Sequence, residues 1–221
     1  MIAEELINQM IPALKPTDKA GKAMLWMEEF KTNQLPVIED SRFKGLISED
    51  IILESNDLDR NIGDFILLSE NCYVNEDQHL FDIIRLANEY DSELVAIVNR
   101  EGEYMGVSRH EDSMKAFSNT LAVQAQGGIL VLEMRHIDYS MAEISRLIES
   151  DDAKILGSYL SQNNNDQNMV FLTLKLNKED LTTVIATLER FEYKVIAKFH
   201  ESVNIETERE RLDNLLNFLN I

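Results

Sequence analysis

Two stretches of the chain place hydroxyl and acidic side chains where they could contact a small ligand. They are Gly45-Leu46-Ile47-Ser48-Glu49-Asp50 and Gly106-Val107-Ser108-Arg109-His110-Glu111-Asp112. In each, an apolar run ends in a polar cluster, which is the pattern of a strand that leads into a helix. A hydroxyl at such a junction can cap the helix, and it can also contact a ligand phosphate while a nearby carboxylate accepts hydrogen bonds from a ribose. Capping alone explains either stretch taken singly.

No catalytic or metal-binding pattern accompanies these stretches. The sequence lacks a GxxxxGK[ST] phosphate loop, a GxGxxG loop and a GxSxG nucleophile elbow. The histidines, at positions 79, 110, 136 and 200, have no metal-ligand spacing. The single cysteine, Cys72, is predicted to be a buried structural thiol. We therefore predict that the protein is not an enzyme and holds no metal.

The chain is strongly acidic, with 21 Lys and Arg against 40 Asp and Glu and a formal net charge of −19. Phosphate backbones and anionic lipid surfaces attract clustered Lys and Arg, so we predict no nucleic-acid and no membrane partner. The excess acid is predicted to keep the protein soluble, and acid pairs such as Asp91 and Glu93 to lie on solvated faces. A lone cysteine cannot form an internal disulfide, which fits the cytoplasm.

The elements that would position the two stretches recur in the same order. The first set has a helix with Ala20, Ala23, Met24 and Met27 buried and Thr17 or Asp18 as its cap, strands at 35–38 and 43–47, and a helix from Ser48. The second set has an extended piece at 72–74, a cap region at 75–77, a helical stripe at 80–87, strands at 94–98 and 104–107, and a helix from about 111.

Equivalent positions in the two sets lie about 60 residues apart. The separation is 59 residues between Asp18 and Asp77 and 61 between Gly45 and Gly106. This spacing indicates a duplication, and each copy is too small to bury its own sheet, so we expect the copies to pack together. A further helix is predicted at 2–11, where apolar residues fall at helical spacing.

A different unit follows a connecting stretch at 118–126. Its pattern predicts a strand at 129–134, a helix with Met141, Ile144, Leu147 and Ile148 on one side, and strands at 154–161 and 169–176 joined by a hairpin. A second helical stripe at 181–191 and a strand at 193–199 complete the order βαββαβ, which implies an antiparallel sheet with both helices on one face. An amphipathic helix is predicted at 206–221.

Residues 9–117 resemble a tandem pair of CBS domains, a Bateman module. The resemblance rests on Leu14-Lys15-Pro16-Thr17-Asp18, Leu35-Pro36-Val37-Ile38-Glu39, Leu94-Val95-Ala96-Ile97-Val98 and the two stretches described first. Residues 128–199 resemble an ACT domain, and the combination is similar to the acetoin-utilisation-type CBS–ACT proteins of bacteria. The fold expected is therefore α+β, with CBS repeats at 1–60 and 61–120, a ferredoxin-like ACT domain at 127–201 and a C-terminal helix at 202–221.

This resemblance implies a regulatory protein that binds an adenosine nucleotide between its CBS copies. The family motif Gly-x-x-[Ser/Thr]-x-x-[Asp/Asn] sets a hydroxyl against phosphate and an acid against ribose. Here Asp50 comes one residue early, which rotates it by about 100° on a helix. In copy two, Asp112 fills the acidic position but Arg109 then takes the hydroxyl position, and a register shifted by one residue gives Ser108 with Glu111 instead. The candidate ligand residues are Pro36, Val37, Ser48, Asp50, Val95, Ala96, Ser108, Arg109 and Asp112, and the candidate ligands are AMP, ADP, ATP or S-adenosylmethionine.

Two hypotheses for function remain open from the sequence. In the first, a ligand at the CBS pair changes how the ACT unit pairs or docks. In the second, the sites have lost their ligands and the protein is a dimeric interaction scaffold. The ACT loop at 136–140 contains no glycine, which favours a pairing or structural role, with Asp138 and Ser140 as candidate site residues or helix caps. Both hypotheses expect a homodimer.

Overall fold

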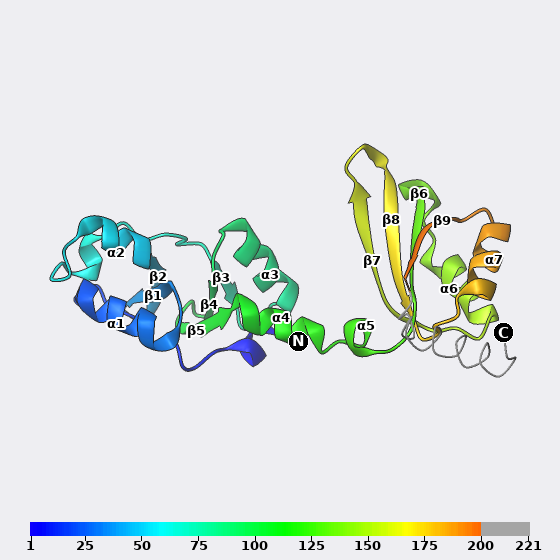
Figure 1. Cartoon of the computed structure of the whole chain (residues 1–221). Helices are drawn as coiled ribbons and strands as arrows, with labels where there is room; N and C mark the ends of the chain where they lie inside the picture. Colours follow the sequence, from blue (N-terminus) through cyan, green and yellow to red (C-terminus); the bar gives the residue numbers. More distant parts are fainter. Residues whose placement is uncertain (200–221) are drawn as a thin grey trace, which may run out of the picture. The chain divides into compact units, whose positions relative to one another are not determined.

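The duplicated elements fold as two copies of one βαββα plan in the computed structural model, which describes residues 1–199. The helix predicted at 206–221 lies outside the described residues. Copy one contains α1 (Ala20–Phe30), β1 (Gln34–Glu39), β2 (Arg42–Ser48) and α2 (Glu49–Ser55). Copy two contains β3 (Tyr73–Asn75), α3 (Leu80–Glu89), β4 (Leu94–Val98), β5 (Tyr104–Arg109) and α4 (His110–Ser118), as Figure 1 shows. The predicted α+β fold is confirmed.

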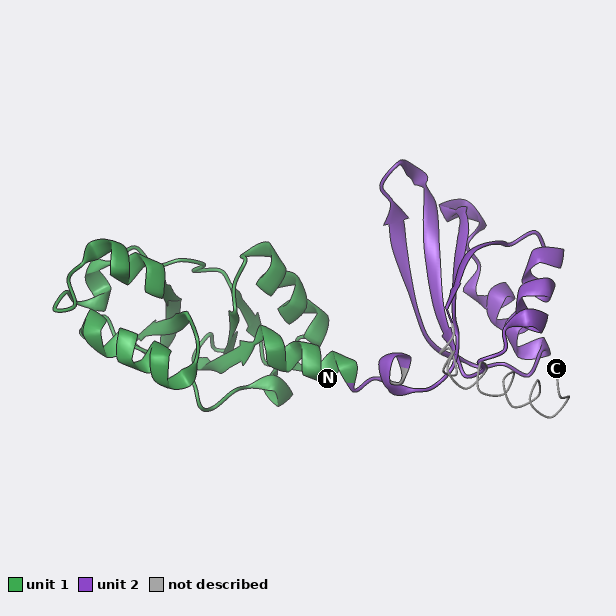
Figure 2. Cartoon of the chain, viewed as in Figure 1, with its two compact units in different colours: residues 1–118 green, residues 119–221 purple. Residues whose placement is uncertain are grey.

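The two copies begin with the same extended step. In copy two, β3 pairs in parallel with β4. In copy one a single residue, Leu14, takes that place and pairs in parallel with Val37 of β1. Both copies belong to one compact unit, Met1–Ser118, which is green in Figure 2. All five residues of β4 are buried, and Leu35, Val37, Val95 and Ala96 have no exposed surface.

The helix predicted at residues 2–11 is wrong. A short 3-10 turn, η1 (Ala3–Leu6), is followed by an extended segment in which the Asn8 N–H donates to the carbonyl of Val107 at 2.7 Å. This segment precedes copy one, yet it adds to the edge of copy two. Isolated short helices are marginal in water, and here burial of Ala3 in the core of copy two and pairing with β5 stabilise the extended form instead.

Copy one receives the matching contact from the segment that precedes copy two. Leu68 and Leu46 exchange two backbone hydrogen bonds of 2.7 and 2.8 Å. A glycine makes room at each crossing. A Cβ on Gly45 would lie 2.7 Å from the Leu68 carbonyl oxygen, and one on Gly106 would lie 2.6 Å from the Ile7 Cγ2 atom. The two copies are therefore joined by segments that cross from one to the other.

The predicted caps of α1 and α3 are also wrong, by one to four residues. Lys19, not Thr17 or Asp18, precedes α1 and makes no side-chain cap. The first N–H groups of α1, those of Ala20 and Gly21, instead donate to the backbone carbonyls of Arg60 and Leu58 at 2.9 Å. His79, beyond the predicted cap region at 75–77, caps α3 by accepting from the Phe81 N–H at 3.2 Å. Tertiary backbone contact satisfies α1 without a capping side chain.

The second unit begins at Asn119, and its described residues, 119–199, are purple in Figure 2 and contain a four-stranded antiparallel sheet. The strands are β6 (Ile129–Arg135), β7 (Ile155–Asn163), β8 (Asp166–Leu176) and β9 (Lys194–Phe199), in the spatial order β7-β8-β6-β9. Helices α6 (Met141–Ser150) and α7 (Thr182–Arg190) cover one face, where alternate residues of β6 and β8 form the core. This is the ferredoxin-like βαββαβ arrangement expected from the sequence.

The connecting stretch at 118–126 holds a short helix that the sequence pattern did not predict, α5 (Leu121–Gln124). It packs against β7 at Gly157. The approach is so close that a Cβ on Gly157 would lie 2.4 Å from the Ala122 Cβ atom. Short 3-10 turns occur at η2 (Ile62–Asp64) and η3 (His136–Asp138). None of the helices in residues 1–199 is long and apolar enough to cross a membrane.

Candidate functional site

The two copies line an open cavity of about 420 Å3 where the segment after α1 meets the ends of α3 and β5. Copy one contributes three successive residues, 31–33, which lead into β1. Copy two contributes the turn between α3 and β4 and the start of α4. Its size falls within the range of small-molecule sites, about 300–1,000 Å3. The lining residues are Lys31, Thr32, Asn33, Ala87, Asn88, Asp91, Ser92, Glu93, Leu94, Arg109, His110 and Glu111.

A reciprocal set of hydrogen bonds joins the copies at this cavity. Gln34 and Glu93 are equivalent positions, 59 residues apart, and each reaches into the other copy. The Gln34 side-chain oxygen accepts from the Ser92 hydroxyl at 2.9 Å and from the Glu93 N–H at 3.2 Å. The Glu93 carboxylate accepts from the Asn33 N–H at 3.2 Å, the Asn33 amide at 3.1 Å and the Thr32 hydroxyl at 3.4 Å. Glu93 is thus a connecting residue and not simply a solvated acid.

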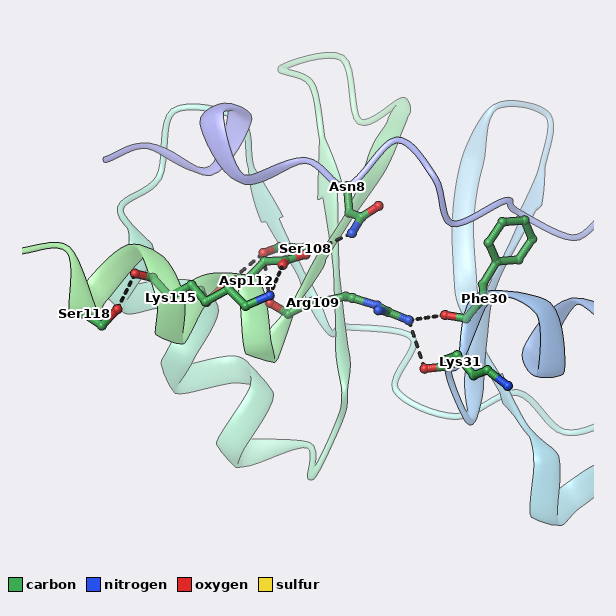
Figure 3. A network of polar contacts seen from close by, with 9 residues as sticks. Asn8, Phe30, Lys31, Ser108, Arg109, Asp112, Lys115 and Ser118 are labelled. Carbon is green, nitrogen blue, oxygen red and sulfur yellow. Dashed lines mark hydrogen bonds and ion pairs between the residues drawn. The ribbon is translucent and has the colours of Figure 1, made fainter.

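Arg109 is the candidate ligand residue that lines the cavity. It ends β5 and extends toward copy one, where its guanidinium donates to the carbonyls of Phe30 and Lys31, the latter at 3.0 Å (Figure 3). These carbonyls close α1, so the cation sits at the negative end of that helix dipole. Arg109 forms no ion pair within residues 1–199, although the chain has 40 acidic residues.

The other two candidates of the second stretch lie away from the cavity lining. Ser108 has no exposed surface, and its hydroxyl lies 3.1 Å from the Ser113 hydroxyl in the core. Asp112 accepts a hydrogen bond of 2.9 Å from the side-chain amide of Asn8 and lies 3.7 Å from the Lys115 ammonium (Figure 3). Asp112 therefore holds the N-terminal segment on copy two.

The candidates in copy one are not gathered at the cavity either. Ser48 caps α2 by accepting from the Ile51 N–H at 3.4 Å, and Asp50 is exposed on the first turn of that helix. Pro36, Val37, Val95 and Ala96 are buried inside β1 and β4, where they could offer only backbone groups to a ligand.

In the second unit, the candidate loop residues make local contacts. Asp138 accepts from the Arg135 guanidinium at 2.6 and 3.0 Å, and this hydrogen-bonded pairing raises the pKa of Arg135. Ser140 caps α6 by accepting from the Glu143 N–H at 3.4 Å. The Ser140 contact is the helix-cap alternative that the sequence left open, whereas Asp138 pairs with Arg135 and caps no helix within the described residues.

The cavity carries both signs of charge. Lys31, Arg109 and the start of α4 supply positive potential, because the first N–H groups of a nine-residue helix point toward its N-terminal end. Asp91 and Glu111 supply carboxylates that could accept hydrogen bonds from hydroxyl groups. Within residues 1–199, no group of three or more His, Cys, Asp or Glu side chains is arranged to hold a metal. Burial raises the pKa of the Cys72 thiol to about 11, so this thiol is not a nucleophile at neutral pH.

Sequence reasoning missed most of the cavity lining, above all residues 31–33 of copy one and Ser92 and Glu93 of copy two. One signal was available. Polar residues stand at equivalent positions, Gln34 and Glu93, just before the apolar runs that begin at Leu35 and Leu94, and this is where the duplicated halves meet. The hydrogen bonds themselves depend on the angle between the copies, which no local pattern encodes.

No family model matches the sequence, and no curated protein matches it. Several of the solved structures that resemble it are CBS-domain proteins. A CBS domain pair/ACT domain protein from Thermotoga maritima is 19% identical, with 53% of this chain and 96% of that chain covered and a TM-score of 0.49. CBSX2 from Arabidopsis thaliana, in its complex with AMP, is 21% identical over 52% of this chain and 95% of that chain, with a TM-score of 0.46. The CBS domains of a transcriptional regulator from Streptococcus pneumoniae are 17% identical over 52% and 98%, with a TM-score of 0.48.

Proposed function

We propose that this protein is a non-enzymatic regulator that binds an adenosine nucleotide in the cavity between its two copies. The observation that carries the proposal is Arg109, a cation without a carboxylate partner in the described residues, in the wall of a cavity of about 420 Å3. An anion is the natural partner for such a guanidinium. A phosphate held there would also lie at the start of α4, and the ribose hydroxyls would meet Asp91 or Glu111.

Ligand binding at this position would act on both copies. Arg109 belongs to copy two, but its hydrogen bonds end on Phe30 and Lys31 of copy one. A phosphate that drew the guanidinium toward itself would change the contact that closes α1. We propose that this change is passed to the second unit, which we assign as an ACT-like pairing or output domain, in a cytoplasmic homodimer without nucleic-acid partners. The proposed boundaries remain 1–60, 61–120 and 127–201.

The alternative is a scaffold that binds no ligand, and one observation favours it. Asp112, which the family motif would direct to a ligand, and Ser108, the hydroxyl next to the motif position, already have partners inside the protein. The same surface would then act only in pairing with other chains.

A thermal-shift panel tests the choice. The full chain is melted with AMP, ADP, ATP, S-adenosylmethionine, NAD and amino acids, and Trp26 fluorescence follows the first unit. A ligand at a hundred times its Kd should stabilise by about 2.7 kcal/mol. Arg109→Met should weaken a nucleotide ~10- to 150-fold, the value of one hydrogen bond to a charged group.

The matched control is Arg100→Met, because Arg100 is 74% exposed and pairs with Asp77 away from the cavity lining. It should leave nucleotide affinity unchanged. Binding that Arg109→Met does not weaken would remove the assigned site, and no shift with any ligand would favour the scaffold.

A further inference from the structure

Arg109 keeps hydrogen-bond donors free in the cavity between the copies. Both hydrogen bonds that its guanidinium donates, to the carbonyls of Phe30 and Lys31, come from one nitrogen, Nη2 (Figure 3). A guanidinium also carries N–H groups on Nη1 and Nε, and these have no protein acceptor within residues 1–199. They can donate to the oxygens of one phosphate group.

The charged groups that line the cavity can balance one phosphate group and no more. With histidine counted as neutral, the cations are Lys31 and Arg109, and the carboxylates are those of Asp91, Glu93 and Glu111. None of these side chains forms an ion pair within residues 1–199. A phosphate monoester carries about two negative charges at neutral pH, which the two cations match. A second phosphate would meet carboxylates that no cation neutralises.

The carboxylates stand close to Arg109 along the backbone of copy two. Glu111 lies in the first turn of α4, two residues after Arg109. Asp91 and Glu93 lie in the turn between α3 and β4, where the Glu93 carboxylate accepts from the Asn33 N–H at 3.2 Å and is thereby held at the cavity. A polyphosphate that extends from Arg109 within a cavity of about 420 Å3 therefore approaches these acids.

The duplication provides no second site of this kind. The residue equivalent to Arg109 is Ser48, which ends β2, and the residue equivalent to Lys31 is Tyr90, which follows α3. Neither of these equivalents carries a positive charge, and the two residues after Ser48 are both acidic. An anion at the related position would meet like charge only, so the two copies together make one anion site.

We propose that the cavity holds a single phosphate group per chain, so that its ligand is a nucleoside monophosphate and charge disfavours di- and triphosphates. This inference rests on the proposed function, since it assumes that a nucleotide phosphate meets Arg109. Two like charges about 4 Å apart weaken binding ~5-fold even at the dielectric constant of water, and more in a protein cleft. AMP should therefore bind at least ~5-fold more tightly than ATP, with ADP between them.

Isothermal titration calorimetry of the full chain with AMP, ADP and ATP measures both affinity and stoichiometry. The buffer contains EDTA and little salt, because a divalent cation would neutralise the additional phosphates. One AMP molecule per chain is expected. In about 0.15 M salt, where the Debye length is about 8 Å, the ratio of AMP affinity to ATP affinity should become smaller. A site that excluded ATP by size would keep the same ratio.

A double variant, Asp91→Asn with Glu111→Gln, removes two of the carboxylates. Asparagine tolerates the left-handed backbone of Asp91, at φ +47°, and both amides keep an oxygen that can accept from a ribose hydroxyl. A weaker ribose contact would affect AMP and ATP alike, whereas the lost charge should bring the affinity for ATP within ~2-fold of that for AMP. The matched control, Glu54→Gln with Asp57→Asn, removes the same charge from exposed positions of copy one outside the cavity lining, and it should leave the ratio unchanged.

Four results would overturn this inference and leave the proposed function in place. They are an affinity for ATP that equals that for AMP, a ratio that salt does not change, a ratio that the Asp91 and Glu111 variant does not change, and two AMP molecules bound per chain. Binding of none of the three nucleotides would refute the proposed function itself, and this inference with it.

Discussion

Alanine substitutions at Gly45 and Gly106, the glycines at the two crossings, test how the copies are joined. For one of them, the expected change in the free energy of unfolding reverses its sign when a second residue is also substituted. Gly45 and Gly106 are equivalent, but a methyl group added to them meets different atoms. At Gly106 it would lie 2.6 Å from the Cγ2 atom of the half-buried Ile7. At Gly45 it would lie 2.7 Å from the Leu68 carbonyl oxygen, which accepts from the Leu46 N–H, and the backbone there has φ +142°. A side chain can swing aside, whereas a bonded carbonyl cannot.

Overpacking costs about 1–3 kcal/mol, and replacing glycine by alanine at a tolerant position regains about 0.4–1 kcal/mol from the unfolded chain. Gly106→Ala should therefore lower the free energy of unfolding by about 1 kcal/mol. Gly45→Ala should lower it by about 3 kcal/mol, since nothing offsets the contact and the positive φ adds strain. Both losses are small enough to leave a domain of ordinary stability folded.

The Ile7→Ala background separates the two sites. With the Cγ2 atom gone, Gly106→Ala should become stabilising by about 0.4–1 kcal/mol, while Gly45→Ala should cost as much as before. Urea unfolding of the full chain, followed by Trp26 fluorescence, measures this cycle in the first unit. If the two substitutions change the free energy of unfolding additively, Ile7 does not lie over Gly106. The crossing of the N-terminal segment onto copy two would then be contradicted.

The remaining predictions concern a buried thiol and the second unit. Burial raises the pKa of the Cys72 thiol from 9.0 to about 11, so the native state keeps this proton at a pH where the unfolded chain loses it. The free energy of unfolding should therefore fall as the pH rises from about 9 to 11. Urea midpoints across this range measure the fall, and Cys72→Ala should remove the contribution of this thiol to it. Gly127→Ala should destabilise the second unit by more than about 2 kcal/mol, because its Cβ would lie 1.9 Å from the Leu176 carbonyl oxygen at φ +139°. Circular dichroism should then show an earlier transition while Trp26 fluorescence is unchanged, and coincident shifts in both would contradict the assignment.

The elements that the sequence predicted well are those whose signal is local. The apolar run Leu94–Val98 predicts a strand, and all five of its residues are buried in β4. The apolar stripe at 141–148 predicts a helix, and it forms one side of α6. The duplication was readable because equivalent residues keep a nearly constant spacing. The order βαββαβ followed from the same alternation of patterns in the second unit.

The errors at the N-terminal segment and at the start of α1 share one cause, which is contact between segments far apart in the chain. The spacing of Leu6 and Ile7 fits a helix, but the competing partner, Val107, lies about a hundred residues away. The cap of α1 comes from the carbonyls of Leu58 and Arg60, some forty residues downstream. The glycines of the two stretches were interpreted as part of a ligand motif, and their contacts in the structure are with the crossing segments. A pattern read along the chain cannot register such contacts.

Duplication would have produced two equal surfaces, and substitution has made them unequal. Where copy one has Gln34 and Ser48, copy two has Glu93 and Arg109, so the charged residues of the shared cavity come mainly from copy two. Residues Lys31–Asn33 of copy one line the cavity, and Asn33 is held by Glu93 of copy two. A ligand bound in the cavity would therefore contact both the segment that connects α1 to β1 and the residues of copy two that hold this segment. By linkage, any interaction elsewhere on the protein that favours one arrangement of this segment would change the affinity for the ligand, and the ligand would change that interaction by the same factor.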